Sequence, residues 1–67
     1  MPIAKSVEIS AESKTSFDDA LKEGAKAACS KLDKVQSIWL KDQEVKVSDD
    51  GTITHYRVWM KVTFELK

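Results

Sequence analysis

The sequence predicts a small α+β domain in the order strand, helix, strand, strand, and three observations carry that prediction. Residues 3–10 alternate between apolar and polar side chains, and residues 16–34 place apolar side chains at helical spacing. Residues 36–66 hold two longer alternating runs on either side of Ser48–Thr52, a turn in which Gly51 supplies positive φ. A right-handed crossover leaves room for the last strand between the first two. We therefore expect a three-stranded antiparallel sheet ordered 1-3-2, with the helix on one face.

The helix is expected to begin at Ser16, after a first strand over Ile3–Ser10 and a polar connection over Ala11–Thr15. The Ser16 hydroxyl can accept from N–H groups of the first turn, and Asp18 and Asp19 complement the positive end of the helix dipole. One stripe of the helix is apolar and rich in small residues, which favours close approach to a sheet: Phe17, Ala20, Leu21, Gly24, Ala25, Ala28 and Leu32. The helix should end near residues 33–34.

The strand predicted over Gln36–Val47 changes phase partway along. Ile38 and Leu40 are apolar at even positions, whereas Val45 and Val47 are apolar at odd positions. A bulge is one explanation. The other is that the far half of the ribbon extends beyond the helix and buries its opposite face against a neighbouring subunit. We favour the second explanation, because the odd face of the last strand also carries a tryptophan.

The last strand is apolar on one face and mixed on the other. Its even positions form a half-buried face: Tyr56, Val58, Met60, Val62, Phe64 and Leu66. Its odd positions combine charges with an aromatic ring: Ile53, His55, Arg57, Trp59, Lys61, Thr63 and Glu65. A plain solvent face does not need a tryptophan among its charges, so this face is expected to contact a partner or a ligand.

Length and charge restrict the classes of protein. The chain of 67 residues is expected to form one domain over residues 1–67. A domain of this size buries only about 60% of its unfolded surface, and Cys29 has no second cysteine to pair with, so we expect a homo-oligomer. With 11 basic and 11 acidic residues, the chain has no net charge to attract nucleic acid or an anionic membrane. No stretch could span a bilayer or act as a signal peptide, so a cytoplasmic location is expected.

Four segments in this order and spacing resemble the dodecin family over nearly the whole chain. They are KSVEIS at residues 5–10, TSFDDA at 15–20, DQEVKV at 42–47 and HYRVWMKVTF at 55–64. The resemblance implies a β-α-β-β subunit whose sheet wraps partly around the helix, and a hollow homo-oligomeric shell of twelve subunits. It further implies a non-catalytic role in binding and storing a small ligand between subunits, namely a flavin such as riboflavin or FMN.

The resemblance also implies which residues line the ligand site. Flavin binders of the family stack isoalloxazine rings between tryptophans of the second strand and contact the ring edge with a glutamine of the third. Alignment through Asp42 and Gln43 puts Ser37 at the tryptophan position and Arg57 at the glutamine position, while Trp39 lies two residues later on the same strand face. We expect Trp39 to stack, Arg57 to hold a carbonyl edge or phosphate and Asp42 to accept from hydroxyls, with Gln43 and Ser37 beside them. The alternative is a dodecin-like assembly that has lost flavin binding and holds another ligand or ions.

The odd-numbered face can be interpreted in two ways. An aromatic and cationic surface suits a flat ligand, and tryptophan and arginine are also typical anchors of subunit interfaces. The face is expected to carry Ser37, Trp39, Arg57 and Trp59. If Val47 pairs with Ile53 across the turn, Arg57 lies opposite Gln43 and the two tryptophans are diagonal neighbours.

The chain offers little for catalysis or metal binding. His55 is its only histidine and Cys29 its only cysteine, and they belong to different elements. Cys29 is expected to be a small buried residue at the border of the helix stripe. No nucleophile, base and oxyanion site can be assembled from these residues, so neither an enzyme nor a metal site is expected.

Overall fold

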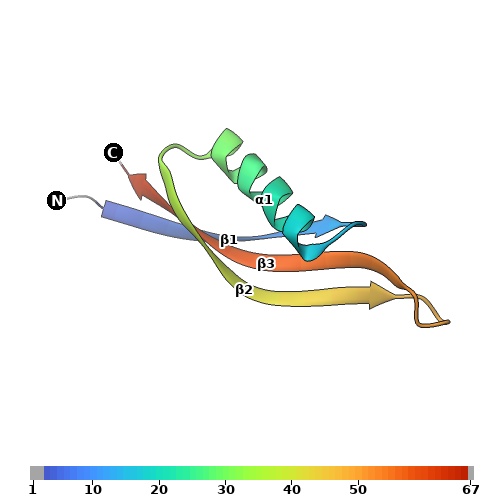
Figure 1. Cartoon of the computed structure of the whole chain (residues 1–67). Helices are drawn as coiled ribbons and strands as arrows, with labels where there is room; N and C mark the ends of the chain where they lie inside the picture. Colours follow the sequence, from blue (N-terminus) through green and yellow to red (C-terminus); the bar gives the residue numbers. More distant parts are fainter. Residues whose placement is uncertain (1–2, 67) are drawn as a thin grey trace.

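The computed structural model describes residues 3–66 and has the predicted topology (Figure 1). Its elements are β1 (Ile3–Ser13), α1 (Phe17–Lys31), β2 (Val35–Val47) and β3 (Ile53–Leu66). The three strands form one antiparallel sheet in the order β1-β3-β2, and α1 lies on one face of it. The predicted α+β class and strand order are therefore confirmed.

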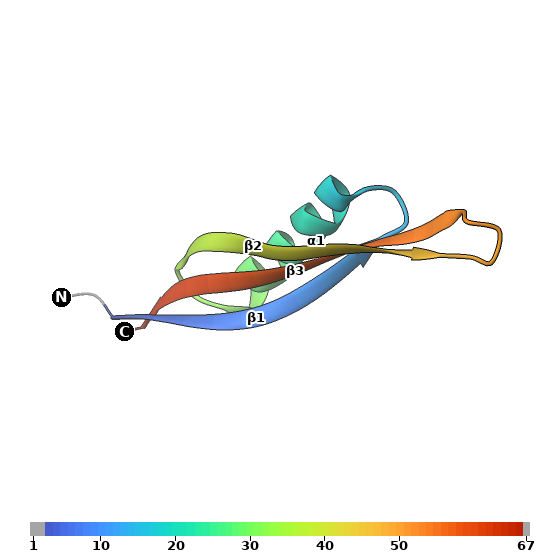
Figure 2. The same cartoon turned by 90° about the horizontal axis from the view of Figure 1, so that it is seen from below.

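The molecule is elongated, with principal extents of 53 × 18 × 13 Å. The hairpin of β2 and β3 runs past the ends of both β1 and α1, so its far end is covered by no other element (Figure 2). The beginning of β1 and the end of β3 lie together at the opposite end of the sheet. The helix thus covers the middle of the sheet, and the hairpin end is a bare two-stranded ribbon.

Strand β1 is longer than the sequence predicted. Pairing with β3 continues through Ala11 and Glu12 to Ser13, which lies opposite Tyr56. The buried Ser13 ends the strand, because its hydroxyl accepts from the Thr15 N–H (2.9 Å) and donates to the carboxylate of Asp19 (2.7 Å). The polar composition of residues 11–13 had suggested a loop. In the structure these residues continue the strand, and Ser13 also binds the first turn of the helix.

The helix begins as predicted and ends earlier. Ser16 is the N-cap, with its Oγ accepting from the Asp19 N–H at 3.0 Å. The last helical residue is Lys31, and Leu32 already has extended backbone angles while its N–H still donates to Ala28 O at 2.8 Å. The positive φ of Lys34 then turns the chain into β2, so the expected helix end near residues 33–34 is two to three residues too late.

The core is small and lies between α1 and the even-numbered face of β3. Its buried apolar side chains come from both elements: Ala20, Ala28, Val58, Met60 and Val62. Partly buried side chains pack around it: Ile9, Ala11, Phe17, Leu21 and Ile38. Gly24 permits the close approach of helix and sheet, because a Cβ at this position would collide with the end of the Met60 side chain. Small helix residues thus place the helix directly on the sheet, as predicted.

A bulge explains the phase change in β2, and our favoured explanation was wrong on this point. The register shifts between Leu40 and Asp42, so Lys41 is an extra residue with no partner on β3. Val45 therefore pairs with Tyr56, whose ring contacts Phe17 of the helix (centroids 5.2 Å apart). Cross-strand partners share a face, so the apolar residues on both sides of the bulge lie on the helix side.

A second bulge changes the partner of Arg57. Val47 pairs with Ile53 as expected, but the register shifts directly afterwards, so Arg57 lies opposite Glu44 and not opposite Gln43. The shift at Lys41 cancels this offset, and Trp39 again pairs with Lys61, which makes it the diagonal neighbour of Trp59 as predicted. The predicted partner of Arg57 was wrong because we had assumed regular pairing of β2 and β3 from the turn onward.

Candidate functional site

The sheet face opposite the helix carries most of the residues singled out from the sequence, and we call it the aromatic face. It consists of four rows of partners across β1, β3 and β2: Ser6–Thr63–Ser37, Glu8–Lys61–Trp39, Ser10–Trp59–Asp42 and Glu12–Arg57–Glu44. The middle two rows form a square in which two tryptophans occupy one diagonal and Lys61 and Asp42 the other. Aromatic rings and charges therefore alternate at the centre of the face.

Arg57 is held in place by carboxylates from both neighbouring strands. Its Nη2 lies 2.6 Å from Glu12 Oε1, and its Nη1 lies 3.6 Å from Glu44 Oε1. The guanidinium carbon is 5.7 Å from the ring centroid of Trp59, within cation–π range. Its Nε is buried and has no hydrogen-bond partner among the described residues. The arginine is thus fixed beside Trp59, with its charge balanced by glutamates.

Glu12 receives a second cation. Lys46 Nζ lies 3.2 Å from the same Glu12 oxygen that Arg57 binds. Hydrogen bonds from Lys46 and then from Arg57 favour the charged carboxylate and hold the pKa of Glu12 below its ordinary value. These pairs tie the end of β1 to β3 and β2 across the face. A separate ion pair, Lys41 Nζ with Glu8 Oε1 (3.3 Å), connects β2 to β1 at the bulge.

The two tryptophans are the most conspicuous apolar groups on this face. The exposed fraction is 69% for Trp39 and 42% for Trp59. Large aromatic rings rarely remain this exposed without a partner, because each represents a large area of apolar surface in water. Trp59 has Arg57 beside it, and Trp39 is the more accessible ring for a planar ligand.

Asp42 reaches the aromatic face only because of the bulge at Lys41. An even-numbered residue of an unbroken strand would share the helix side with Leu40, but Asp42 pairs with Trp59. It therefore lies where it can accept hydrogen bonds from a ligand held against the tryptophans. Ser37 also lies on this face, two rows from Asp42, opposite Thr63.

Gln43 is the predicted site residue that the structure does not bring to the aromatic face. It pairs with Val58, whose side chain is in the core, so Gln43 lies on the helix side. It still borders a shallow hollow of about 380 Å³ at the bulge, with Leu40, Lys41 and Asp42. Of the five predicted residues, Ser37, Trp39, Asp42 and Arg57 share a face and Gln43 does not.

Sequence reasoning missed the carboxylates that hold Arg57. Glu12 continues the polar alternation of Ser6, Glu8 and Ser10 along β1, and this alternation would have placed it on the aromatic face once β1 was extended to Ser13. Glu44 had no such signal, because its position depends on both bulges. The charge balance of the aromatic face can thus be recognised only when the pairing register of the strands is known.

Further features complete the description. Cys29 is exposed rather than buried as expected, because it lies on the outer side of the helix. Within residues 3–66, no group of three or more His, Cys, Asp or Glu side chains is placed to hold a metal ion. In the same part of the chain, no helix is long and apolar enough to cross a bilayer.

The fold and this face define a small β-α-β-β protein with one covered and one open sheet face. The family model of dodecin matches residues 3–67. The chain therefore belongs to the dodecin family, and the resemblance of its four sequence segments is confirmed.

Solved dodecins have closely similar subunits. Dodecin from Streptomyces davaonensis superposes with a TM-score of 0.91 at 26% identity, covering 98% of this chain and 96% of the other. A mutant of the dodecin from Thermus thermophilus gives a TM-score of 0.91 at 21% identity over 100% and 98% of the two chains. The calcium dodecin of Mycobacterium tuberculosis, described as a calcium-chelating antigen, gives 0.83 at 26% identity over 97% and 91%. A comparison with curated protein sequences gives no significant match.

Proposed function

We propose that this chain, as one domain over residues 1–67, assembles into a closed homo-oligomer of twelve copies that binds a flavin between subunits. The protein would store the ligand in the cytoplasm and catalyse no reaction. Family membership supports the assembly. The small core supports it as well, since only five apolar side chains are buried in the isolated subunit among the described residues.

The observation that carries the ligand part is the exposed tryptophan pair beside Asp42. Trp39 is 69% exposed, is the diagonal neighbour of Trp59, and lies one row from the Asp42 carboxylate. Two copies that bring their aromatic faces together would sandwich a planar ring between their Trp39 side chains. Asp42 would then accept hydrogen bonds from hydroxyl groups of the flavin side chain, and Arg57 would border the ring edge.

Flavin fluorescence tests this proposal directly. Stacking on tryptophan quenches the fluorescence of an isoalloxazine ring, so titrating the purified protein into riboflavin or FMN should remove the emission with saturation. Micromolar protein that leaves both flavins fully fluorescent would rule out the flavin site. The substitution Ser37→Trp is a useful second probe, because it returns a tryptophan to the position where flavin binders of the family have one. It should strengthen quenching if position 37 lies against the ring.

A second candidate function is an assembly without flavin. The observation in its favour is the environment of Arg57, whose charge is already satisfied by Glu12 and Glu44 and which lies against Trp59. In this case the aromatic face joins subunits and binds no ring, and the oligomer carries another ligand or ions at its symmetry axes. It predicts a full-sized oligomer that purifies without colour. The substitution Trp59→Ala should then dissociate the oligomer, and an intact oligomer would count against this packing role.

A further inference from the structure

The charges of the aromatic face are paired at one end of the face and unpaired at its centre. The row around Arg57 is a connected group of ion pairs across three strands. In the square of the two tryptophans, by contrast, Lys61 and Asp42 form no ion pair within residues 3–66. Lys61 lies beside Trp39 across the strands, and Asp42 follows Trp39 along β2. An unpaired cation and an unpaired carboxylate thus lie on two sides of the more exposed ring.

Lys61 is unpaired because another lysine holds its nearest carboxylate. The register places Glu8 directly opposite Lys61, where cross-strand side chains ordinarily interact. Glu8 instead binds Lys41, whose Nζ lies 3.3 Å from its Oε1. The strands β1 and β2 are two strand spacings apart, about 10 Å, so the Lys41 side chain extends across β3 to make this pair. The bulge residue of β2 thereby leaves the Lys61 ammonium free to bind another anion.

The position of Lys61 suits an anionic group on a ligand stacked against Trp39. The two residues are direct cross-strand partners, and Trp39 is 69% exposed while Lys61 is half-buried. A lysine ammonium is a compact charge with three donors on a flexible chain, and it binds phosphate oxygens as a point charge. Arg57 lies two rows from Trp39, and its guanidinium is already bound by two glutamates. It therefore suits the ring edge, and Lys61 suits a phosphate.

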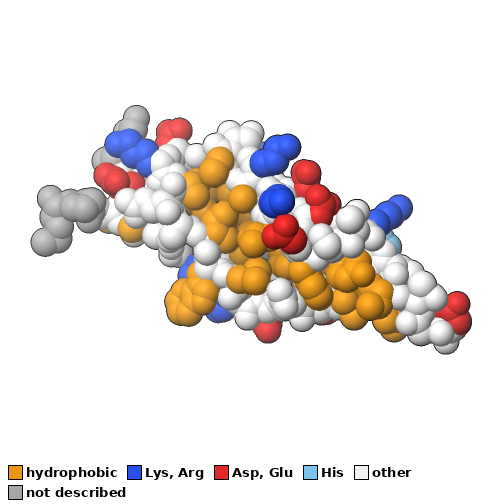
Figure 3. Space-filling model, viewed as in Figure 1, with side chains coloured by type: hydrophobic (Ala, Val, Ile, Leu, Met, Phe, Trp, Pro, Cys, Tyr) orange, Lys and Arg blue, Asp and Glu red, His pale blue; other side chains and the backbone are white. Residues whose placement is uncertain are grey.

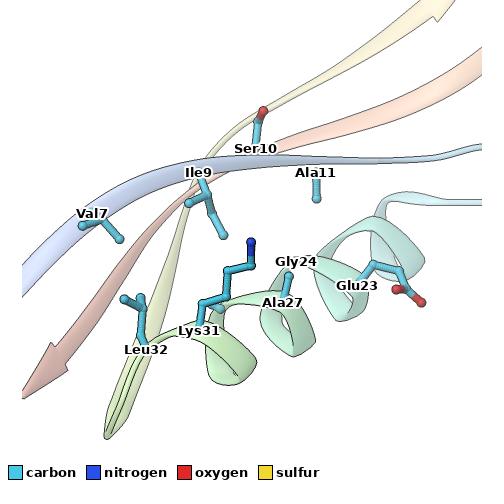
Figure 4. Close-up of a pocket in the computed structure, with 10 residues that line it drawn as sticks. Val7, Ile9, Ser10, Ala11, Glu23, Gly24, Ala27, Lys31 and Leu32 are labelled. Atoms are coloured by element: carbon cyan, nitrogen blue, oxygen red, sulfur yellow. The ribbon is translucent and has the colours of Figure 1, made fainter.

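The helix side of the molecule is less suited to such a ligand. Figure 3 shows hydrophobic side chains continuing from the helix toward the hairpin. A groove of about 370 Å³ lies between β1 and α1, and the Lys31 side chain reaches over it (Figure 4). Small and aliphatic side chains make up most of its lining, and none of the described lining residues is aromatic. A ligand that combines a planar ring with a phosphate is therefore matched by the aromatic face and not by this groove.

We infer that Lys61 is the specificity-determining residue of the aromatic face, where it binds the phosphate of a phosphorylated flavin. Lys41 keeps Lys61 free for this role by holding Glu8. The inference rests on the flavin-binding part of the proposed function, and it adds which flavin is preferred and which residue selects it. FMN carries a phosphate monoester, whereas riboflavin has the same ring and hydroxyl chain without it. FMN should therefore bind about tenfold more tightly than riboflavin, as expected for one charge-assisted contact in a partly exposed site.

The ratio of the FMN and riboflavin affinities tests the role of Lys61. Both affinities are measured by fluorescence titration, and changes in ring stacking or folding affect both flavins alike. Added salt should reduce the FMN preference, because it screens a partly exposed ion pair. Lys61→Gln should bring the two affinities together. Arg57→Gln should keep the wild-type ratio, whatever it does to the affinity for the ring.

A second set of variants tests how Lys61 is kept free. Lys41→Gln releases Glu8, which should then pair with Lys61 and lower the FMN preference. Adding Glu8→Gln to Lys41→Gln removes the competing carboxylate and should restore the preference. Lys46→Gln is the matched control, because it removes the same charge from the same face while Arg57 still binds Glu12. It should keep the wild-type ratio.

The outcomes separate this inference from the proposed function. Protein that leaves both flavins fluorescent would overturn the flavin proposal and this inference together. Protein that binds both flavins equally well, or whose FMN preference survives Lys61→Gln, would overturn this inference alone and leave the flavin site standing. A preference lost in Arg57→Gln and kept in Lys61→Gln would assign the phosphate to Arg57 and likewise overturn it.

Discussion

The two faces of β3 differ in how far one chain completes them. On the helix side, Val58 and Val62 are fully buried by α1 and the neighbouring strands. On the other side, the intervening Trp59 remains 42% exposed between rows of paired charges. Adjacent residues of one strand therefore alternate between a fully packed core and a surface that is still exposed to solvent. The comparison teaches that this sequence encodes two separable things, a subunit and the contacts of that subunit.

The two faces are held together by different interactions. The helix side depends on close packing between small helix residues and Met60, with Gly24 in direct contact with it. The aromatic face depends on ion pairs centred on Arg57 and on exposed rings. Substitutions on the helix side should mainly change the stability of the subunit. Substitutions on the aromatic face should mainly change what the subunit binds.

The largest effect on stability is expected from Met60→Ala. The side chain is 1% exposed and fills the space beneath Gly24, so truncation removes buried apolar surface and leaves a cavity. We expect the free energy of unfolding to fall by about 2–5 kcal/mol, measured by denaturant titration at one fixed protein concentration. Lys61→Ala, the next residue on the opposite face, is the control and should change it by less than about 0.5 kcal/mol. Equal losses for both would break the distinction between the faces.

Binding should distinguish the two tryptophans. Trp39→Ala removes the more accessible ring, and loss of one stacking partner is worth about 1–3 kcal/mol, so flavin affinity should fall roughly five- to 150-fold. Trp59→Ala should cost less flavin affinity, because Arg57 already lies against that ring. Fluorescence titration of both variants gives the ratio. A larger loss of flavin affinity for Trp59→Ala than for Trp39→Ala would contradict the stacking role given to Trp39.

Much of the fold could be predicted from the sequence because its signals are local. The alternation of β3 from Tyr56 to Leu66, the small-residue stripe of the helix and the Ser16 cap each follow from a few neighbouring residues. Gly51 has φ +88° in the hairpin turn, where the sequence predicted positive φ. Such features are determined by side-chain periodicity and backbone preference, which the sequence displays directly.

The site was predicted less completely, because its composition depends on register. Two extra residues, Lys41 on β2 and Thr54 on β3, decide that Asp42 joins the tryptophans, that Gln43 leaves them and that Arg57 lies opposite Glu44. A bulge reverses the face of every following side chain, yet it needs no special residue that would reveal it in the sequence. The phase change of the valines was the one available signal, and we assigned it to the wrong cause.

A moderate effect on stability is expected from a substitution at the N-cap of α1, the helix that covers the buried face of β3. Ser16→Ala removes the acceptor for the Asp19 N–H and leaves a donor of the first turn without its partner. The free energy of unfolding should fall by about 1 kcal/mol, while the affinity for flavin stays unchanged because the aromatic face is not touched. Ser16→Asp, which keeps an acceptor at the cap, should restore stability. If Ser16→Ala reduces flavin binding more than stability, the two faces are coupled through the helix.

The smallest effect is a pH dependence from the aromatic face. Hydrogen bonds from Lys46 and then Arg57 lower the pKa of Glu12 from its ordinary 4.5, so the charged form is favoured in the folded state. The resulting stabilisation is fully present above pH 4.5 and is lost as the pH falls through the lowered pKa. Glu12→Gln should therefore be less stable than the wild type near neutral pH, and the two denaturation midpoints should converge in acid. Glu23→Gln, on the helix, provides the matched control and should follow the wild-type curve. A constant gap between Glu12→Gln and wild type at every pH would mean that Glu12 contributes through shape and not through its charge.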